Sequence, residues 1–294
     1  MRPTTKLRHL MMQPGAVIAP GVADALNARL VAKHGFDAIY MTGAGTTAVR
    51  LGMPDIGLLT MNEMIDNAER IAEASGLPLI ADADNGYGGV MNVRRTVKGY
   101  ERAGAAAIHL EDQLMPKRCG HLMGKLLVPT EEMIAKIHAA VDARTDPDFM
   151  IIARTDAIAV EGFDAAIERA SRYGEAGADV LFVEAPSAAQ LPLVSARLNG
   201  PLLYNMAASG KTPFLSKTQI EELGFKLIIY PNWVMLASIR AVSHVLQTLK
   251  ESGSIASLVN DVASFREFFD LLGMDDVQAL ESRYGVDDKA RAKY

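Results

Sequence analysis

Short apolar runs alternate with amphipathic stretches along most of this 294-residue chain. The runs are continuously hydrophobic, which is typical of strands covered on both faces rather than on one. Each is bounded by turn residues and is too short to form a long helix. We expect strands at Val17–Pro20, Ala38–Thr42, Leu79–Asp82, Ala106–Glu111, Phe149–Thr155, Asp179–Glu184, Pro201–Met206 and Leu227–Pro231.

The segments between these strands carry the signals of helices. The stretches 60–63 (Thr-Met-Asn-Glu) and 216–219 (Ser-Lys-Thr-Gln) have the capping-box form, in which the two end residues satisfy backbone donors reciprocally. Val93, Val97 and Tyr100 are spaced to form one apolar helix face. Eight strands that alternate with helices predict a (β/α)8 TIM-type barrel. A doubly wound open sheet is the alternative, and the lack of a Gly-rich dinucleotide loop favours closure.

Both ends of the chain are expected to add helices to this single barrel domain, 1–294. Residues 1–15 are basic and Met-rich and predict an outer helix, and residues 252–294 predict a C-terminal helical extension. Within that extension, 257–272 is expected to be helical and carries five large apolar residues. They must be buried against this barrel or against another subunit, and the pattern leaves both open.

Composition narrows the class of protein. A net charge of −5 and a pI near 5.7 argue against nucleic acid or an anionic membrane as the main partner. No apolar run approaches the roughly 18–20 residues that span a bilayer, and we see no signal-peptide pattern at the N-terminus. The single cysteine cannot form an internal disulfide. We therefore expect a cytoplasmic protein without membrane or nucleic-acid partners.

Polar residues gather where the predicted strands end. In a barrel, these carboxyl ends and the loops after them form the catalytic rim. The turn Thr42-Gly43-Ala44 offers backbone N–H groups suited to a carboxylate or a developing enolate oxygen. So many polar endings on one rim indicate a functional site. They are Tyr40, the turn 42–44, Asp82, Asp84, Glu111, Arg154, Glu184 and Asn205, with Asp55 in the loop after the second strand.

The carboxylates of this rim predict a metal site. Asp82 and Asp84 stand two residues apart at a strand end, so we expect their side chains to point the same way. Converging carboxylates repel each other unless a cation offsets their charge. With Asp55 and Glu111 nearby and only oxygen ligands on offer, Mg²⁺ fits best, with Mn²⁺ as an alternative ion. The other interpretation is a pair of aspartates that cap the following turn.

The stretch Lys117-Arg118-Cys119-Gly120-His121 holds the only cysteine. Neighbouring cations and a histidine lower the pKa of a thiol, and a glycine lets the loop move. The alternative is a small buried hydrophobe, which the polar surroundings disfavour. Arg154, at a buried strand end, must be neutralised by a nearby acid or must present its fork to a substrate carboxylate.

These residues resemble the isocitrate lyase/phosphoenolpyruvate mutase superfamily. Residues 117–121 are similar to the Lys-[Lys/Arg]-Cys-Gly-His signature of its carbon–carbon lyase branch, and 82–88 and 111–113 resemble its metal loop and next acidic strand end. The resemblance runs from about Tyr40 to Trp233. It implies a barrel, Mg²⁺, a small 2-hydroxy or 2-oxo di- or tricarboxylate substrate, and a gating loop. It also implies a homotetramer, a dimer of dimers that exchange C-terminal helices.

Within that branch, 141–149 and 153–157 look closest to 2-methylisocitrate lyases, whereas Ala207-Ala208 replaces their Thr-Glu pair and is nearer to dimethylmalate lyases. The resemblance implies Mg²⁺-dependent cleavage to pyruvate and a carboxylic acid, with Cys119 as general acid and Tyr40 as a candidate base. Arg154, Glu184 and Asn205 would orient the substrate, and Lys117, Arg118 and His121 would complete the loop. Oxaloacetate hydrolysis or decarboxylation, phosphonate mutase chemistry and a non-catalytic carboxylate-binding barrel are the alternatives.

Overall fold

The computed structural model describes residues 1–120 and 122–293. The chain divides into two compact units, Met1–Met235 and Leu236–Tyr294. The boundary falls inside one long helix, α10 (Trp233–Ser252). The domain limits expected at residues 15 and 252 stay predictions.

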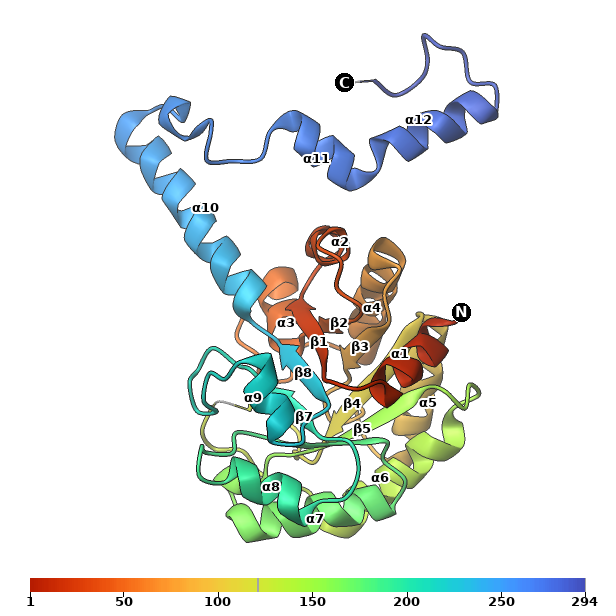
Figure 1. Ribbon diagram of the computed structural model, residues 1–294, viewed down its shortest axis with the longest axis vertical. Coiled ribbons are helices and arrows are strands. Elements are labelled where there is room, and N and C mark those ends of the chain that lie inside the picture. Colours follow the sequence, from red (N-terminus) through yellow and green to blue (C-terminus); the bar gives the residue numbers. More distant parts are fainter. Residues whose placement is uncertain (121, 294) are drawn as a thin grey trace. The chain divides into compact units, whose positions relative to one another are not determined.

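The first unit contains one eight-stranded parallel sheet in the order β6-β5-β4-β3-β2-β1-β8-β7. A parallel bridge between Leu181 and Leu202 joins the outer strands and closes the sheet into a barrel. The (β/α)8 prediction is therefore confirmed (Figure 1). The strands are β1 (Val17–Val22), β2 (Ile39–Met41), β3 (Leu79–Asp82), β4 (Ala105–Glu111), β5 (Met150–Thr155), β6 (Val180–Val183), β7 (Leu203–Asn205) and β8 (Leu227–Tyr230).

Helices of this unit follow the strands along the chain. Thr60 and Ser216 form the two predicted capping boxes. Another helix begins at Thr130, because Pro129 supplies the extended backbone before it. The helices are α1 (Pro3–Met12), α2 (Ala25–Lys33), α3 (Gly43–Leu51), α4 (Met61–Ser75), α5 (Val90–Arg102), α6 (Thr130–Ala143), α7 (Phe163–Glu175), α8 (Leu191–Arg197) and α9 (Lys217–Glu222), with a 3₁₀ turn, η1 (Ala157–Ala159).

Helix α1 covers the amino end of the barrel. Leu7 and Met11 pack in one buried cluster with the first residues of several strands. Thr4 donates to Asp146 at 2.7 Å and Thr5 to Asp148 at 2.6 Å, which ties α1 to the turn before β5. The interior is therefore filled and covered at this end, and a site is left for the carboxyl ends of the strands.

The second unit holds the rest of α10, a 3₁₀ turn η2 (Ala256–Leu258), α11 (Phe265–Leu272) and α12 (Met274–Arg283). The helix expected at 257–272 begins only at Phe265, because Ser264 and Glu267 form a capping box that starts it there. Ile239, Val242 and Phe265 are exposed. Among the described residues, no helix combines the length and the apolarity that a bilayer crossing requires.

Candidate active site

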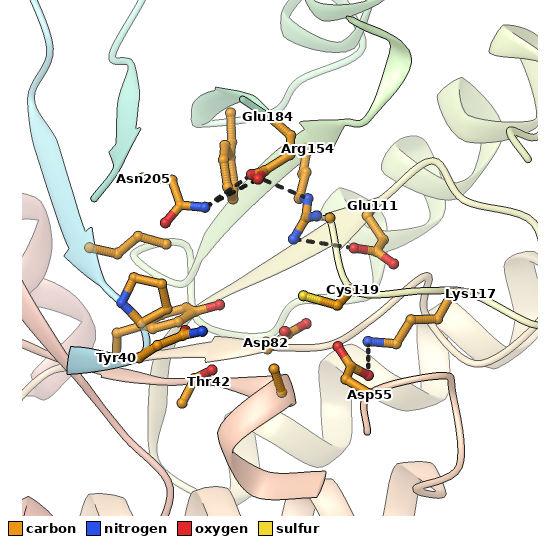
Figure 2. A pocket seen from close by; sticks show the side chains of 16 residues that line it. Tyr40, Thr42, Asp55, Asp82, Glu111, Lys117, Cys119, Arg154, Glu184 and Asn205 are labelled. Carbon is orange, nitrogen blue, oxygen red and sulfur yellow. Dashed lines mark hydrogen bonds and ion pairs between the residues drawn. The ribbon is translucent and has the colours of Figure 1, made fainter. Parts of the chain in front are cut away.

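A pocket opens among the residues at the carboxyl ends of the strands, and several loops contribute to it (Figure 2). Polar side chains reach it from β2, β3, β4, β5 and β7, from the residue after β6, and from the cysteine loop, which we define as residues 114–126. The lining residues are Tyr40, Thr42, Ala44, Asp55, Asp82, Glu111, Lys117, Cys119, Gly120, Arg154, Phe182, Glu184, Asn205, Ile229, Pro231 and Asn232.

Most of the residues predicted for the site line this pocket, but three do not. Gly43, Asp84 and Arg118 are absent from the lining. Arg118 is exposed, and its guanidinium donates to the Met123 carbonyl at 3.3 Å instead. His121 lies outside the described residues.

Asp82 faces the pocket while Asp84 does not. The expectation that both point the same way assumed a continuing strand, but β3 ends at Asp82 and Asp84 has a left-handed φ of 47°. The Asp84 amide donates to Asp82 Oδ1 at 2.9 Å, and the Gly43 amide donates to Asp82 Oδ2 at 3.1 Å. Gly43 therefore orients a carboxylate of the site, rather than presenting its N–H to a substrate.

Lys117 bridges two of the predicted metal-binding carboxylates. Its ammonium lies 2.6 Å from Asp55 Oδ1 and also contacts Asp84 Oδ1. Burial by itself would lower the pKa of Lys117, but Asp84, Glu111 and the other acids raise that pKa well above its ordinary value. The lysine is therefore a permanent cation. Burial raises the pKa of Asp84 to about 6, although the charge of Lys117 lowers it.

Arg154 is the second cation of the pocket. Its guanidinium lies 3.3 Å from Glu111 Oε2 and 4.0 Å from Glu184 Oε2, and it binds Asp156 through two hydrogen bonds of 2.9 and 3.1 Å. Burial raises the pKa of Glu111 well above its ordinary value. Burial would raise the pKa of Asp156 as well, but Arg154 and Lys125 lower it to about 2. The Arg154–Asp156 pair is thus ionised and fixed at the pocket wall.

Tyr40 contacts a histidine that the sequence analysis passed over. The Tyr40 hydroxyl lies 2.8 Å from Nε2 of the fully buried His109, and that nitrogen lies 3.3 Å from Asp82 Oδ1. Burial, and then the charge of Asp82, raise the pKa of Tyr40 well above its ordinary value. The phenol therefore keeps its proton at neutral pH, which makes it a poor base.

Cys119 reaches the pocket from the cysteine loop. Its amide donates to the Asp55 carbonyl at 3.1 Å, and its sulfur points into the space between Asp82 and Arg154 in Figure 2. The half-buried thiol thus faces the acids and the arginine, as a proton donor to a bound substrate would have to.

The charges of the lining suit a divalent cation. Among the described residues, it contains the carboxylates Asp55, Asp82, Glu111 and Glu184 but only two fixed cations, Lys117 and Arg154. Glu111 Oε1 is buried without a hydrogen-bond partner. No three His, Cys, Asp or Glu side chains in the described part of the chain are arranged to hold a metal directly. An all-oxygen set of this kind fits Mg²⁺, which takes one or two carboxylates and keeps several waters.

Four lining residues and one buried partner of the site were not predicted from the sequence. Phe182, Ile229 and Pro231 form an apolar part of the lining, and Asn232 adds an amide one residue beyond the last predicted strand. His109 stands two residues before Glu111 on the same strand, so their side chains share a face. A polar residue within an otherwise apolar strand was the signal that could have revealed it.

Comparison with known proteins agrees with this geometry. The family model described as phosphoenolpyruvate phosphomutase matches residues 7–250. A 2,3-dimethylmalate lyase of Eubacterium barkeri is 45% identical over 287 residues, 97% of this chain and 99% of that protein. A 2-methylisocitrate lyase of Aeropyrum pernix is 45% identical over 282 residues, 96% of this chain and 91% of that protein.

A solved structure shows the same likeness in three dimensions. Oxaloacetate acetylhydrolase in complex with 3,3-difluorooxaloacetate superposes with a TM-score of 0.93 at 37% identity, covering 98% of this chain and 100% of that one. The similarity extends over barrel and tail alike. The chain therefore belongs to the phosphoenolpyruvate mutase/isocitrate lyase superfamily, in its carbon–carbon lyase branch.

Proposed function

We propose that this protein cleaves the C2–C3 bond of a substituted 2-hydroxy acid, either 2,3-dimethylmalate or 2-methylisocitrate, to pyruvate and a second carboxylic acid. The observation that carries the proposal is the placement of Cys119 in one pocket with Arg154 and the Asp82 carboxylate. Cleavage of this kind needs an acid for the leaving carbon and positive charge for the carboxylates, and this pocket offers both.

Mg²⁺ would be held by Asp82, and through water by Asp55 and Glu111. Asp84, predicted as a second direct ligand, does not line the pocket and contacts Lys117 instead. When bound, it would polarise the substrate oxygen and lower the pKa of the 2-hydroxyl group. The Gly43 amide fixes Asp82 for this purpose. Lys117 holds Asp55 and Asp84 together by its charge.

Side chains of the protein then donate the proton and orient the substrate carboxylates. The 2-hydroxyl group releases its proton to solvent as the C2–C3 bond breaks, and the electron pair of that bond passes to C3 and its carboxylate. Cys119 gives its thiol proton to C3, which releases the second acid. Arg154 and Asn205 orient the substrate carboxylates, and Glu184 accepts from Asn205 at 3.1 Å. Because Tyr40 keeps its proton, we assign it to hydrogen-bond donation and not to the role of base predicted for it.

The lining favours a substrate with an apolar substituent. Ala207 and Ala208, which the sequence analysis linked to substrate choice, are not lining residues. Phe182, Ile229 and Pro231 instead offer an apolar surface. Arg154 already contacts Glu111, Asp156 and Glu184, so the pocket has little positive charge to offset a third substrate carboxylate. A methyl group at C3 suits this surface better than a third carboxylate, so we place 2,3-dimethylmalate first.

A panel assay tests this assignment. The purified protein with Mg²⁺ is incubated with 2,3-dimethylmalate, 2-methylisocitrate, isocitrate and oxaloacetate, and release of pyruvate, glyoxylate, oxalate and acetate is followed. Pyruvate from 2,3-dimethylmalate, abolished by excess EDTA, is the expected result. If oxaloacetate were the only acid cleaved, and gave oxalate and acetate, the protein would be a hydrolase. The similarity to oxaloacetate acetylhydrolase is the reason to test this alternative.

We also propose that the protein is a homotetramer, a dimer of helix-swapped dimers. The support is the apolar surface of the second unit, where Leu246, Val262 and Phe265 are exposed. Light scattering on the intact chain should give four times the monomer mass. A monomer would contradict this assembly without touching the proposed chemistry.

A further inference from the structure

A buried lysine beyond the pocket connects the cysteine loop to Arg154. Lys125 does not line the pocket, yet only 2% of its side chain is exposed. Its ammonium donates to the Gly120 carbonyl at 2.5 Å and to Asp156 Oδ1 at 2.8 Å. One cation thus bonds to the main chain next to Cys119 and to a carboxylate of the neighbouring strand end.

The carboxylate that Lys125 binds is the one that holds Arg154. Arg154 Nη2 donates to Asp156 Oδ1 at 3.1 Å, so the two cations share a single oxygen. The Asp156 amide donates in turn to Asp112 at 3.0 Å, which fixes the residue to the end of β4. Lys125 therefore bonds to a rigid support, and not to a side chain that could follow the loop.

The main chain at Gly120 also packs against the guanidinium of Arg154. A Cβ at Gly120 would overlap Arg154 Nη2 and would lie 3.0 Å from Glu184 Oε1. The main chain at Gly120 is thus packed directly against the guanidinium, and its carbonyl is held there by Lys125. The bond from Lys125 sets how far residue 120, and with it Cys119, stands from Arg154.

We propose that Lys125 is a positioning residue, which holds the Cys119–Gly120 main chain against the Arg154–Asp156 pair so that thiol and guanidinium face the substrate together. Its contribution to turnover rests on the proposed lyase function; its effect on the position of Cys119 does not. A lysine that only neutralises buried Asp156 would stabilise the fold and leave the thiol where it is.

Alkylation of the thiol distinguishes these two roles, because Cys119 is the only cysteine in the chain and the label reports on it alone. We would measure the rate of iodoacetamide labelling in the presence of Mg²⁺ and oxalate for the wild-type protein, Lys125→Met and Lys125→Arg. Loss of a charge-assisted hydrogen bond should speed labelling of Lys125→Met by roughly tenfold or more. Lys125→Arg keeps the charge and its donors and should restore most of the protection.

Lys226→Met is the matched control. Lys226 also donates to loop carbonyls, those of Gln13 and Gly15, but in the loop that precedes β1. Its loss should lower the melting temperature and leave the labelling rate unchanged. If Lys125→Met labels at the wild-type rate, or if Lys226→Met labels as fast as Lys125→Met, the positioning role is overturned.

Turnover supplies a second readout. On an acid that the wild-type protein cleaves, Lys125→Met should lower kcat roughly tenfold or more, and its effect should not add to that of Asp156→Asn because both break one network. Fully additive effects would contradict the proposal. If no acid of the panel is cleaved, the proposed function fails, and the labelling rates still decide whether Lys125 positions Cys119.

Discussion

The backbone amide of Cys119 donates to the backbone carbonyl of Asp55 at 3.1 Å. This bond ties the residue with the thiol to the loop between α3 and α4. The Asp55 carboxylate in turn binds Lys117 at 2.6 Å, so the two loops are joined by main chain and side chain together. The proton donor of the proposed reaction and the carboxylates expected to hold the metal are therefore placed by the same contacts.

Replacing Lys117 tests its role between the acids. Lys117→Met leaves Asp55 and Asp84 buried without their cation, and breaking a buried pair in this way costs about 3–5 kcal/mol. In EDTA the variant should melt well below the wild-type protein, and Mg²⁺ should recover part of the loss. Exposed Lys98→Met is the control. Equal melting temperatures in EDTA would mean that Lys117 does not hold these carboxylates together.

A methyl group at Gly43 tests how strictly Asp82 must be placed. The Cβ of Gly43→Ala would overlap Asp82 Oδ2 and lie 2.9 Å from its Cγ, so the carboxylate has to move. A displacement of about 1 Å can cost roughly 100-fold in rate, and we expect that loss together with weaker Mg²⁺ binding by calorimetry. Gly89→Ala, where a Cβ meets nothing within 4 Å, should leave both unchanged. Wild-type Mg²⁺ affinity in Gly43→Ala would argue against Asp82 as a ligand.

The docking of α1 should depend on pH through Asp146. Burial would raise the pKa of Asp146, but hydrogen bonds from Thr4 and the Asp148 amide, together with Arg2 and Arg8, lower it below its ordinary 3.8. A lowered pKa in the folded state means that this stabilisation is complete above pH 3.8 and is lost as the pH falls through the folded-state pKa.

Asp146→Asn should therefore lower the melting temperature by about 2–4 °C at pH 7, and the difference should shrink toward pH 3. Thermal melts of both proteins across pH 3–8 give the comparison. A difference that grew on acidification would contradict the sign of the shift.

The barrel could be predicted because its signals are local. Continuous apolar runs, capping boxes and a regular alternation each follow from a few neighbouring residues, and Leu79–Asp82 was predicted with its observed ends. The tail was harder, since the apolar residues of 257–272 indicate burial but not where a helix starts. Ser264, which caps α11, was the local signal that was passed over.

The sequence predicts which residues lie on the rim of the barrel. It does not predict the direction of each side chain or its contacts with distant residues. Asp84 and Arg118 stand within two positions of pocket residues in sequence, but a left-handed backbone turns Asp84 away and Arg118 projects outward. Lys125 belongs to no motif that would single it out. Its proposed role depends on its contact with Asp156, which is 31 residues away in the chain. Contacts of this kind are set by the packing of loops, which no single segment encodes.

Cys119→Ser tests the central claim most directly. Pyruvate release from 2,3-dimethylmalate is measured for the wild-type protein and the variant, with Mg²⁺ binding to each followed by calorimetry. Because a serine hydroxyl is a far weaker acid than a thiol, the account predicts unchanged Mg²⁺ affinity and a loss of turnover of roughly 100- to 10,000-fold. Undiminished pyruvate release from Cys119→Ser would remove the cysteine from the mechanism and contradict the account.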